Sequence, residues 1–355
     1  MSTPTWLKVA VAGGTALGVT GAAATVGLAA RRRRAVHRWR TGDEHVLGSL
    51  RSPAVTVVAS DGVLLHAEVD EVDTDEADEV DTDEAGGPTI VFVHGWSLNL
   101  DCWHFQRATL RGRLRTVLYD QRSHGRSGRS RQEHCTVDQL AADLEAVIDR
   151  LAPVGPIVLV GHSMGGMTIV GLARRSPALM RDRVVGVALI STSAGNIGRL
   201  MRGRRGDLLD KAMPAILGAL NRAPGAMDAG RRFTGGFAYE VTKRFAFASK
   251  VPEDFVTFTD QMIAANPMSV FTYFWPVFSS LDLYAVLPAF RALPTVVIVG
   301  TEDTLTPVSH ARRIAEAIPT AELVVIPDTG HMVLFERHEQ VDELLGELIK
   351  RASDA

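Results

Sequence analysis

The stretch IVLVGHSMGG, residues 157–166, decides the fold of this 355-residue chain. Its first four residues are apolar and typical of a buried strand, and a helical pattern runs from residue 164 to residue 175. The segment that joins them, Gly161-His162-Ser163-Met164-Gly165, has the form G-x-S-x-G, which occurs once in the chain. Between a strand and a helix, this pattern predicts a sharp turn that presents Ser163 as a nucleophile.

The two glycines of this turn have a steric role. Gly161 and Gly165 let neighbouring backbone pass close to the turn, where a Cβ atom would collide. The N-terminus of the helix that follows favours negative charge developing beside Ser163. We therefore expect both glycines to support the site.

The hydroxyl of Ser163 needs a base to take its proton. Three histidines follow Ser163 in the sequence. His310 and His338 fall within helical patterns and are expected on solvated helix faces, whereas His331 lies in a loop after a strand-like run. A loop in that place can reach across to the serine, so His331 is the predicted base.

The base in turn needs an acid that orients it. Asp303 follows the strand-like run 295–299 and precedes His331, and Glu302 beside it is the alternative. We predict a catalytic triad of Ser163, Asp303 and His331. Such a triad uses neither metal nor cofactor, and we expect none.

Negative charge on a substrate carbonyl oxygen is stabilised by backbone N–H donors. One predicted donor is Met164, the residue after the nucleophile. The other is Trp96, in the loop His94-Gly95-Trp96-Ser97 that follows the first strand-like run of the core. Gly95 permits close approach of this loop. His94 is an alternative base, but we expect it to pack the loop.

Strand-like and helix-like runs alternate along most of the chain. Apolar strands between amphipathic helices predict an α/β fold, a mostly parallel sheet with helices on both faces. Two β-type runs, 54–59 and 63–69, flank Ser60-Asp61-Gly62 and predict a hairpin. The other strand-like runs are 89–93, 115–119, 157–160, 184–190, 295–299 and 322–326, and the helical runs include 137–151, 164–175, 309–318 and 334–351.

Residues 193–290 lack such strand-like runs and hold 14 of the 22 aromatic residues, so we predict a helical cap inserted into the core. Its aromatic side chains line an acyl pocket or form the cap's own core. The predicted organisation is a tail at 1–8, a transmembrane helix at 9–30, a basic linker at 31–51, core segments at 52–192 and 291–355, and the cap at 193–290.

The net charge of −3 averages over unlike segments. Six arginines lie within 31–40, and eleven acidic residues lie within 68–84, where DEVDTDEA occurs twice in succession. We predict a disordered acidic loop at 68–87, because it has too few apolar residues to bury. A calcium loop is the alternative, but the turn glycine of an EF-hand is missing. The arginines do not spread over a folded face, so no nucleic-acid partner is expected.

Residues 9–30 carry no charge and are long enough to cross a bilayer as a helix. Four arginines follow directly at 31–34, and positive charge stays on the cytoplasmic side of a membrane. We therefore predict a single-pass anchor in the cell membrane, with the catalytic domain in the cytoplasm. A cleaved signal peptide or a helix that does not insert is the alternative.

Four motifs carry a resemblance to the α/β-hydrolase superfamily over about residues 52–351. They are HGWSLN from residue 94, DQRSHGRSG from residue 120, GHSMGG from residue 161 and GTEDTLTP from residue 300. They resemble those of bacterial serine esterases, monoacylglycerol lipases and cofactor-free haloperoxidase-type perhydrolases. The superfamily usually has glycine where this chain has Ser123. The resemblance implies the same nucleophile, acid, base and oxyanion donors as above.

Together these features predict a membrane-tethered, lipase-like serine esterase. It would cleave small-molecule or lipid esters of apolar acyl groups through an acyl-enzyme. A thioesterase, a perhydrolase and a carbon–carbon bond hydrolase use the same triad and are alternatives. A non-catalytic interaction protein of this fold is a further alternative. No oligomeric state is predicted.

Overall fold

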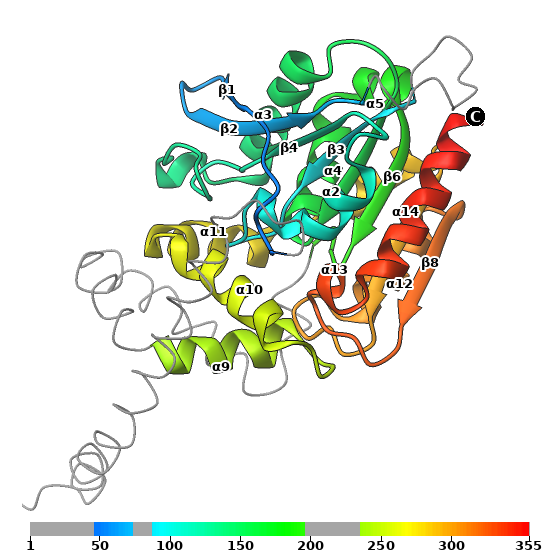
Figure 1. Ribbon diagram of the computed structural model, residues 1–355. Helices are drawn as coiled ribbons and strands as arrows, with labels where there is room; N and C mark the ends of the chain where they lie inside the picture. Colours follow the sequence, from blue (N-terminus) through cyan, green and yellow to red (C-terminus); the bar gives the residue numbers. More distant parts are fainter. Residues whose placement is uncertain (1–45, 74–86, 196–234, 355) are drawn as a thin grey trace, which may run out of the picture.

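The computed structural model describes residues 46–73, 87–195 and 235–354 (Figure 1). Its centre is one eight-stranded sheet in the order β1-β2-β4-β3-β5-β6-β7-β8. This confirms the predicted α/β class. The strands are β1 (Ala54–Val58), β2 (Leu64–Asp70), β3 (Thr89–Val93), β4 (Thr116–Tyr119), β5 (Ile157–His162), β6 (Val184–Ile190), β7 (Thr295–Gly300) and β8 (Ala321–Ile326).

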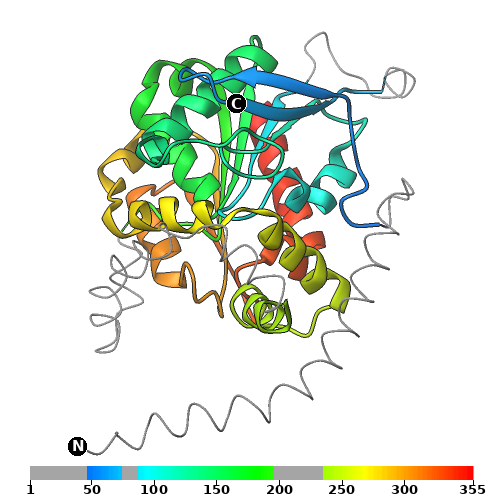
Figure 2. The same cartoon turned by 90° about the vertical axis from the view of Figure 1, so that its left-hand side faces the viewer.

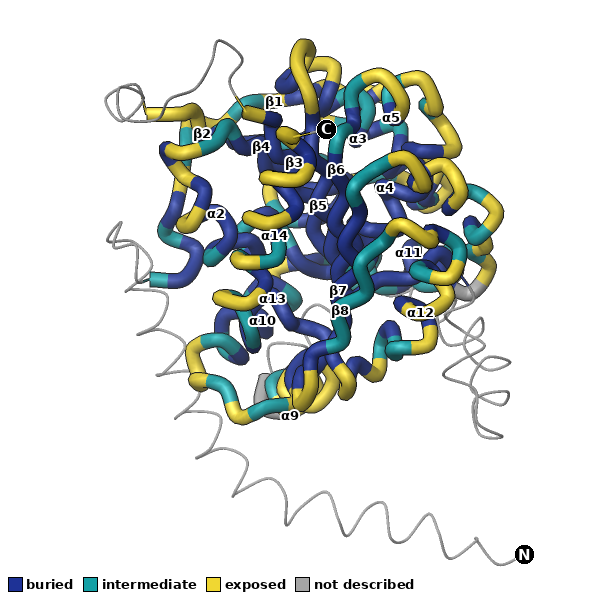
Figure 3. Tube along the Cα trace, turned by 90° about the vertical axis from the view of Figure 1, so that its right-hand side faces the viewer, coloured by how far each residue is buried: buried dark blue, intermediate teal, exposed yellow. Residues whose placement is uncertain are grey.

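The sheet is parallel from β4 to β8 and antiparallel at its β1–β2 end. β1 and β2 form the predicted hairpin, with Val58 paired to Leu64 across the turn. Strands β3, β5 and β6 lie in the middle of the molecule and are buried, as Figure 3 shows. Burial on both faces explains why their sequences are continuously apolar.

Helices cover both faces of the sheet (Figure 2). α3 and α4 pack on each other on one face, where α12 packs against β7 and β8. α14 packs against β6 and β7 from the other face and contacts α2. The helices of the core are α2 (His104–Leu110), α3 (Val137–Leu151), α4 (Met164–Arg175), α5 (Pro177–Arg183), α12 (Val308–Ala317), α13 (Val333–Glu336) and α14 (His338–Ser353), with the short 3-10 helices η1 (Leu100–Trp103) and η2 (Gln132–His134).

The helical runs are confirmed, with one difference near the C-terminus. Thr136 accepts a hydrogen bond from the N–H of Gln139 and so caps the start of α3. The run predicted as one helix at 334–351 is two helices, α13 and α14, because the chain leaves the helical conformation at Arg337 (φ −139°).

Between β6 and β7, in the segment predicted as a cap, the described residues form three helices and a 3-10 helix. They are α9 (Gly235–Ala246), α10 (Glu253–Ala265), α11 (Met268–Ser280) and η3 (Tyr284–Phe290). Figures 1 and 2 place α9, α10 and α11 on the side of the molecule away from the β1–β2 hairpin. Residues 196–234 of the predicted cap lie outside the described residues.

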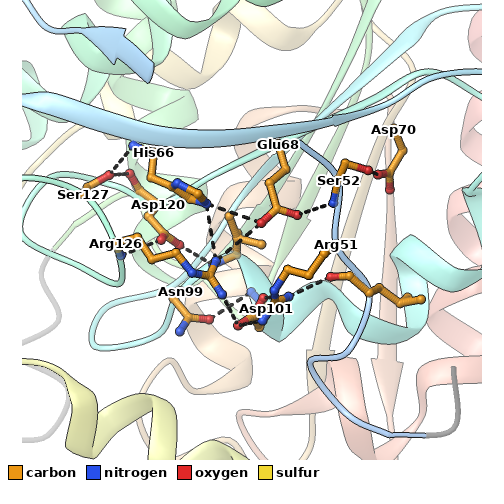
Figure 4. A network of polar contacts seen from close by, with 12 residues as sticks. Arg51, Ser52, His66, Glu68, Asp70, Asn99, Asp101, Asp120, Arg126 and Ser127 are labelled. Atoms are coloured by element: carbon orange, nitrogen blue, oxygen red, sulfur yellow. Dashed lines mark hydrogen bonds and ion pairs between the residues drawn. The ribbon is translucent and has the colours of Figure 1, made fainter. Parts of the chain in front are cut away.

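The predicted acidic loop begins too early. Glu68 and Asp70 are buried residues of β2, and Arg107 of α2 donates to both carboxylates at 2.7 Å. Burial alone would raise the pKa of Glu68, but hydrogen bonds from His66 and Arg107 hold it at about 2. Figure 4 shows Ser52 between Glu68 and Asp70, hydrogen-bonded to both carboxylates. Residues 74–86 of the predicted loop lie outside the described residues.

The membrane anchor predicted at residues 9–30 lies outside the described residues. Among the helices that the structure describes, none combines the length and apolar character that a membrane span requires.

Candidate active site

Ser163 occupies the sharp turn predicted between β5 and α4. Its backbone is in the left-handed region (φ 52°, ψ −117°), which costs a non-glycine residue about 1 kcal/mol. Hydrogen bonds hold this conformation: the Ser163 N–H donates to the Ile190 carbonyl at 2.9 Å. The Ser163 carbonyl accepts from the Thr192 hydroxyl at 2.6 Å. The turn is thus fixed by the end of the neighbouring strand β6.

Gly161 and Gly165 have the steric role that the sequence predicts. A Cβ atom on Gly165 would lie 1.9 Å from the carbonyl oxygen of Val93, at the end of β3. A Cβ atom on Gly161 would lie 2.7 Å from the backbone nitrogen of Gly166. Both contacts are with backbone, which cannot yield as a side chain can. These glycines therefore allow β3, β5 and α4 to meet at Ser163.

Asp303 and His331 come together as a hydrogen-bonded pair. Nδ1 of His331 lies 2.9 Å from Oδ2 of Asp303, and both side chains are buried. Oδ1 of Asp303 accepts from the N–H groups of Leu305 and Thr306. Burial alone would raise the pKa of Asp303, but the charge of His331 and these hydrogen bonds hold it below its usual value. Asp303 is thus kept ionised, whereas Glu302 is exposed.

The loop of His331 is joined to the serine turn through His162. Nε2 of His162 lies 3.1 Å from the carbonyl oxygen of His331, and the two rings are 4.9 Å apart at their centres. Complete burial lowers the pKa of His162 to about 3, so its ring is neutral at pH 7. The carboxyl ends of β5, β7 and β8 therefore bring the three predicted triad residues to one region.

The loop that carries Trp96 also reaches the serine turn. A Cβ atom on Gly95 would lie 2.8 Å from Nδ1 of His162 and 3.2 Å from Cβ of Ser163. The Leu98 N–H donates to the Gly95 carbonyl at 3.3 Å and closes a tight turn (Gly95–Leu98). We call it the oxyanion turn, after the role that the sequence predicts for Trp96. Gly95 thus permits the close approach that the sequence predicts.

His94 is buried at the start of this turn. Its Nε2 accepts from the Gln121 N–H at 2.9 Å, so its Nδ1–H donates to the Gly95 carbonyl at 2.7 Å. Burial lowers the pKa of His94 to about 4. Both ring nitrogens are occupied by backbone partners, which favours the predicted packing role over that of a base.

Two histidines differ from their predicted environment. His310 is buried, not solvated: its Nδ1 lies 2.8 Å from Oγ of Ser193 and 3.1 Å from the hydroxyl of Tyr284. His338 is only partly exposed and stacks on Phe105, with ring centres 3.9 Å apart. A helical pattern shows that one face is polar, but it does not show that another element covers that face.

Sequence reasoning missed Glu336, which fixes the loop of His331. Its buried carboxylate accepts from the Gly330 N–H at 2.7 Å and from the Ser249 N–H at 2.8 Å. It therefore links the histidine loop to the segment between α9 and α10. The only local signal is its place five residues after His331, which does not distinguish it from a surface acid.

Ser123, the departure from the superfamily pattern, takes the conformation that glycine usually supplies. Its φ is 68°, and its hydroxyl accepts a hydrogen bond from the Ser130 N–H at 2.9 Å. That hydrogen bond offsets part of the cost of the left-handed backbone. The turn is thus formed without the glycine.

The described residues contain no group of three or more His, Cys, Asp or Glu side chains that could hold a metal ion. Cys102 and Cys135 are buried free thiols.

A sequence model of the alpha/beta hydrolase fold family matches residues 88–338. The chain therefore belongs to this family, and the resemblance that its four motifs carry is confirmed. The matched region runs from β3 to the start of α14 and includes Ser163, Asp303 and His331.

Proteins that are similar to this chain in sequence or structure carry names that describe different activities. A dihydrolipoyllysine-residue acetyltransferase component of an acetoin cleaving system from Pseudomonas putida is 28% identical, over 73% of this chain and 62% of its own length. A protein of Mycobacterium tuberculosis named as a non-heme bromoperoxidase is 28% identical, over 72% of this chain and 91% of its own. The structure of an esterase from Thermogutta terrifontis is similar with a TM-score of 0.63, at 24% identity, over 85% of this chain and 100% of its own.

Proposed function

We propose that the protein is a serine hydrolase that cleaves carboxylic esters through an acyl-enzyme. The observation that carries the proposal is the hydrogen bond of 2.9 Å between His331 and the buried Asp303, in a loop joined to the left-handed turn of Ser163. An orienting acid, a base and a strained serine at the start of a helix are the parts of a nucleophilic serine.

The residues take the following roles. The hydrogen bond to Asp303 keeps the proton of neutral His331 on Nδ1, so Nε2 is free to accept the Ser163 proton as Oγ attacks the carbonyl carbon. The backbone N–H groups of Met164 and Trp96 stabilise the negative oxygen, each by about 3 kcal/mol. His331 then protonates the leaving alcohol. Water attacks the acyl-Ser163 ester by the same route in reverse and releases the acid.

An apolar acyl group fits the surroundings of the oxyanion turn. The Trp96 ring lies edge-on to the rings of Phe271 and Phe278, with centres 5.3 Å and 5.2 Å away. These rings belong to α11, so an aromatic wall stands beside the residue that would hold the carbonyl oxygen. Such walls bind hydrocarbon better than charged groups.

A series of p-nitrophenyl esters from acetate to laurate tests the proposal. We expect turnover that rises from acetate toward medium chains and falls about a thousandfold or more in Ser163→Ala. A fluorophosphonate should label the wild-type chain and Ser353→Ala, an exposed serine control, but not Ser163→Ala. Activity that survives Ser163→Ala would contradict the mechanism. Labelling without ester turnover would instead favour a thioester, peroxide-dependent or carbon–carbon bond reaction at the same serine.

We also propose, from the sequence of residues 9–30 alone, that a membrane tether precedes the hydrolase. The full chain should then stay with membranes through an alkaline carbonate wash. Leu17→Arg with Val19→Arg should release it, because charge at the centre of a span costs several kcal/mol. Thr3→Arg, outside the uncharged stretch, is the control. Release of the unsubstituted chain by the wash would refute the tether.

A further inference from the structure

The oxyanion turn has a backbone conformation that needs support. Ser97, its third residue, is in the left-handed region with a φ of 59° and is buried. This conformation is unfavourable for a serine. The turn determines where the Trp96 N–H points, so whatever fixes Ser97 also fixes that donor.

The core holds the turn at its entry. The side-chain amide of Gln121 donates to the His94 carbonyl at 2.6 Å and is itself held by the Thr168 hydroxyl at 2.9 Å. Beyond the turn, the Leu100 N–H donates to Asp120 at 2.8 Å, and Figure 4 shows Asp120 among the polar groups behind it. None of these contacts involves Ser97, the residue near the end of the turn, which we call its exit.

Asn266 fixes the exit of the turn. Its side-chain nitrogen donates to the Ser97 carbonyl at 2.6 Å and to the Met262 carbonyl at 2.9 Å. Asn266 is buried and stands at the joint of α10 and α11, directly before Pro267, which caps α11. The joint between two helices of the predicted cap thus reaches across 169 residues of sequence to the oxyanion turn.

A second hydrogen bond crosses the same boundary in the opposite direction. The indole N–H of Trp96 donates to the Val270 carbonyl in the first turn of α11, at 3.1 Å. The turn therefore donates to α11 through Trp96 and accepts from the joint through Ser97. A pair of hydrogen bonds of opposite polarity fixes an orientation, whereas apolar packing alone would let the turn slide.

From these contacts we infer that Asn266 is a positioning residue for oxyanion stabilisation. It makes the direction of the Trp96 N–H depend on how the α10–α11 joint is seated. The inference rests on the proposed function, because it assigns a supporting residue to the same site. Without the Asn266 donor, the buried Ser97 carbonyl loses its partner and the left-handed turn relaxes. A displacement of about 1 Å at a reacting group can cost about a hundredfold in rate.

The test compares Asn266→Ala and Asn266→Asp with Thr242→Val. Asn266→Asp keeps the side-chain shape but removes the donor. Thr242→Val removes the buried hydrogen bond between Thr242 and Asp260 at 3.2 Å, which joins α9 to α10 and does not touch the turn. For each variant we would measure Tm, kcat and KM on a p-nitrophenyl ester, and the affinity of a trifluoromethyl ketone, whose adduct with serine carries the oxyanion.

We expect both Asn266 variants to lower kcat by roughly 10- to 100-fold while KM changes less than about threefold. The affinity of the trifluoromethyl ketone should fall by the same factor as kcat/KM, because only the adduct uses the oxyanion donors. Thr242→Val should lower Tm as an Asn266 variant does and leave kcat within about twofold. Trp96→Phe removes the second hydrogen bond and keeps an aromatic ring against α11. It should show a smaller loss of the same kind, and it decides the question if the Asn266 variants do not fold.

The inference is overturned if kcat is unchanged in the Asn266 variants, if only KM rises, or if kcat falls while the ketone binds as before. It is also overturned if Thr242→Val lowers kcat as much as Asn266→Ala, since general loosening would then explain the loss. A wild-type chain without Ser163-dependent turnover would overturn the proposed function itself, and the inference with it.

Discussion

Nδ1 of His331 and Oδ2 of Asp303 are 2.9 Å apart, and the carboxylate also accepts from three groups of its own loop. These contacts come from Leu305 and Thr306, so the orientation of the Asp303 carboxylate is fixed by its own loop, independently of His331. An acid fixed in this way can hold only one tautomer of His331, the one with its proton on Nδ1. In the proposed mechanism, Nε2 is then the nitrogen that accepts the Ser163 proton.

Asp303→Asn is expected to lower kcat for a p-nitrophenyl ester by about 10³- to 10⁴-fold, because the amide stabilises the wrong tautomer of His331. Glu302→Gln is the matched control: Glu302 is the neighbouring acid, it is exposed, and we expect activity within about twofold of wild type. Equal losses of kcat in the two variants would contradict the assignment of Asp303 as the acid.

Three buried histidines make the fold sensitive to acid. Burial lowers the pKa of His94 to about 4 and those of His124 and His162 to about 3. Between pH 6.5 and about 4 the unfolded chain takes up protons that the native histidines do not. The free energy of unfolding should therefore fall as the pH falls through this window, by roughly 1 kcal/mol per pH unit for each histidine.

Urea unfolding at several pH values between 7 and 4 would measure this slope. His124→Gln should remove the contribution of one histidine, roughly 1 kcal/mol per pH unit, whatever its effect on stability at pH 7. Carboxyl groups titrate alike in both proteins and cancel in the comparison. An identical slope in the two proteins would mean that His124 is not buried as a neutral ring.

The parts that sequence could predict are those that depend on local rules. The turn of Ser163 needs a strand, two small residues and a helix start, all within residues 157–175, and each leaves a pattern in the sequence. Asp303 and His331 could be paired because loops after parallel strands meet at one edge of the sheet. Their order along the chain then left few alternatives.

The parts that sequence missed depend on partners far away in the chain. Glu68 and Asp70 begin a segment whose composition indicates disorder. Both lie in a strand paired with β4, and ion pairs with Arg107 compensate for the burial of their carboxylates. The hydrogen bond from Asn266 to Ser97 likewise joins a helix end to a turn 169 residues away. No periodicity in either segment records such a contact.

The buried ion pairs of Arg107 yield a prediction of stability. The side chains of Arg107, Glu68 and Asp70 are each at most 2% exposed. Arg107→Met should lower the free energy of unfolding in urea by about 3–5 kcal/mol, because it takes away the buried guanidinium that pairs with two buried carboxylates. Arg351→Met removes a half-exposed ion pair with Glu322 at 3.0 Å and should cost less than about 1 kcal/mol. Similar losses would show that the Arg107 network is hydrated.

Substituting alanine for Gly165 and for Gly346 tests the serine turn, because the two changes in the free energy of unfolding should have opposite signs. A Cβ atom on Gly165 would meet the Val93 carbonyl oxygen at 1.9 Å, so Gly165→Ala must push β3 and α4 apart. We expect it to lower the free energy of unfolding by several kcal/mol and to abolish labelling by a fluorophosphonate. Gly346 lies within α14, and a Cβ atom added there would meet nothing within 4 Å, so Gly346→Ala should raise stability by about 1 kcal/mol. Urea unfolding of both variants gives the comparison. If Gly165→Ala were tolerated like Gly346→Ala, the close contact between β3 and the serine turn would not exist, and the site would have to be built differently.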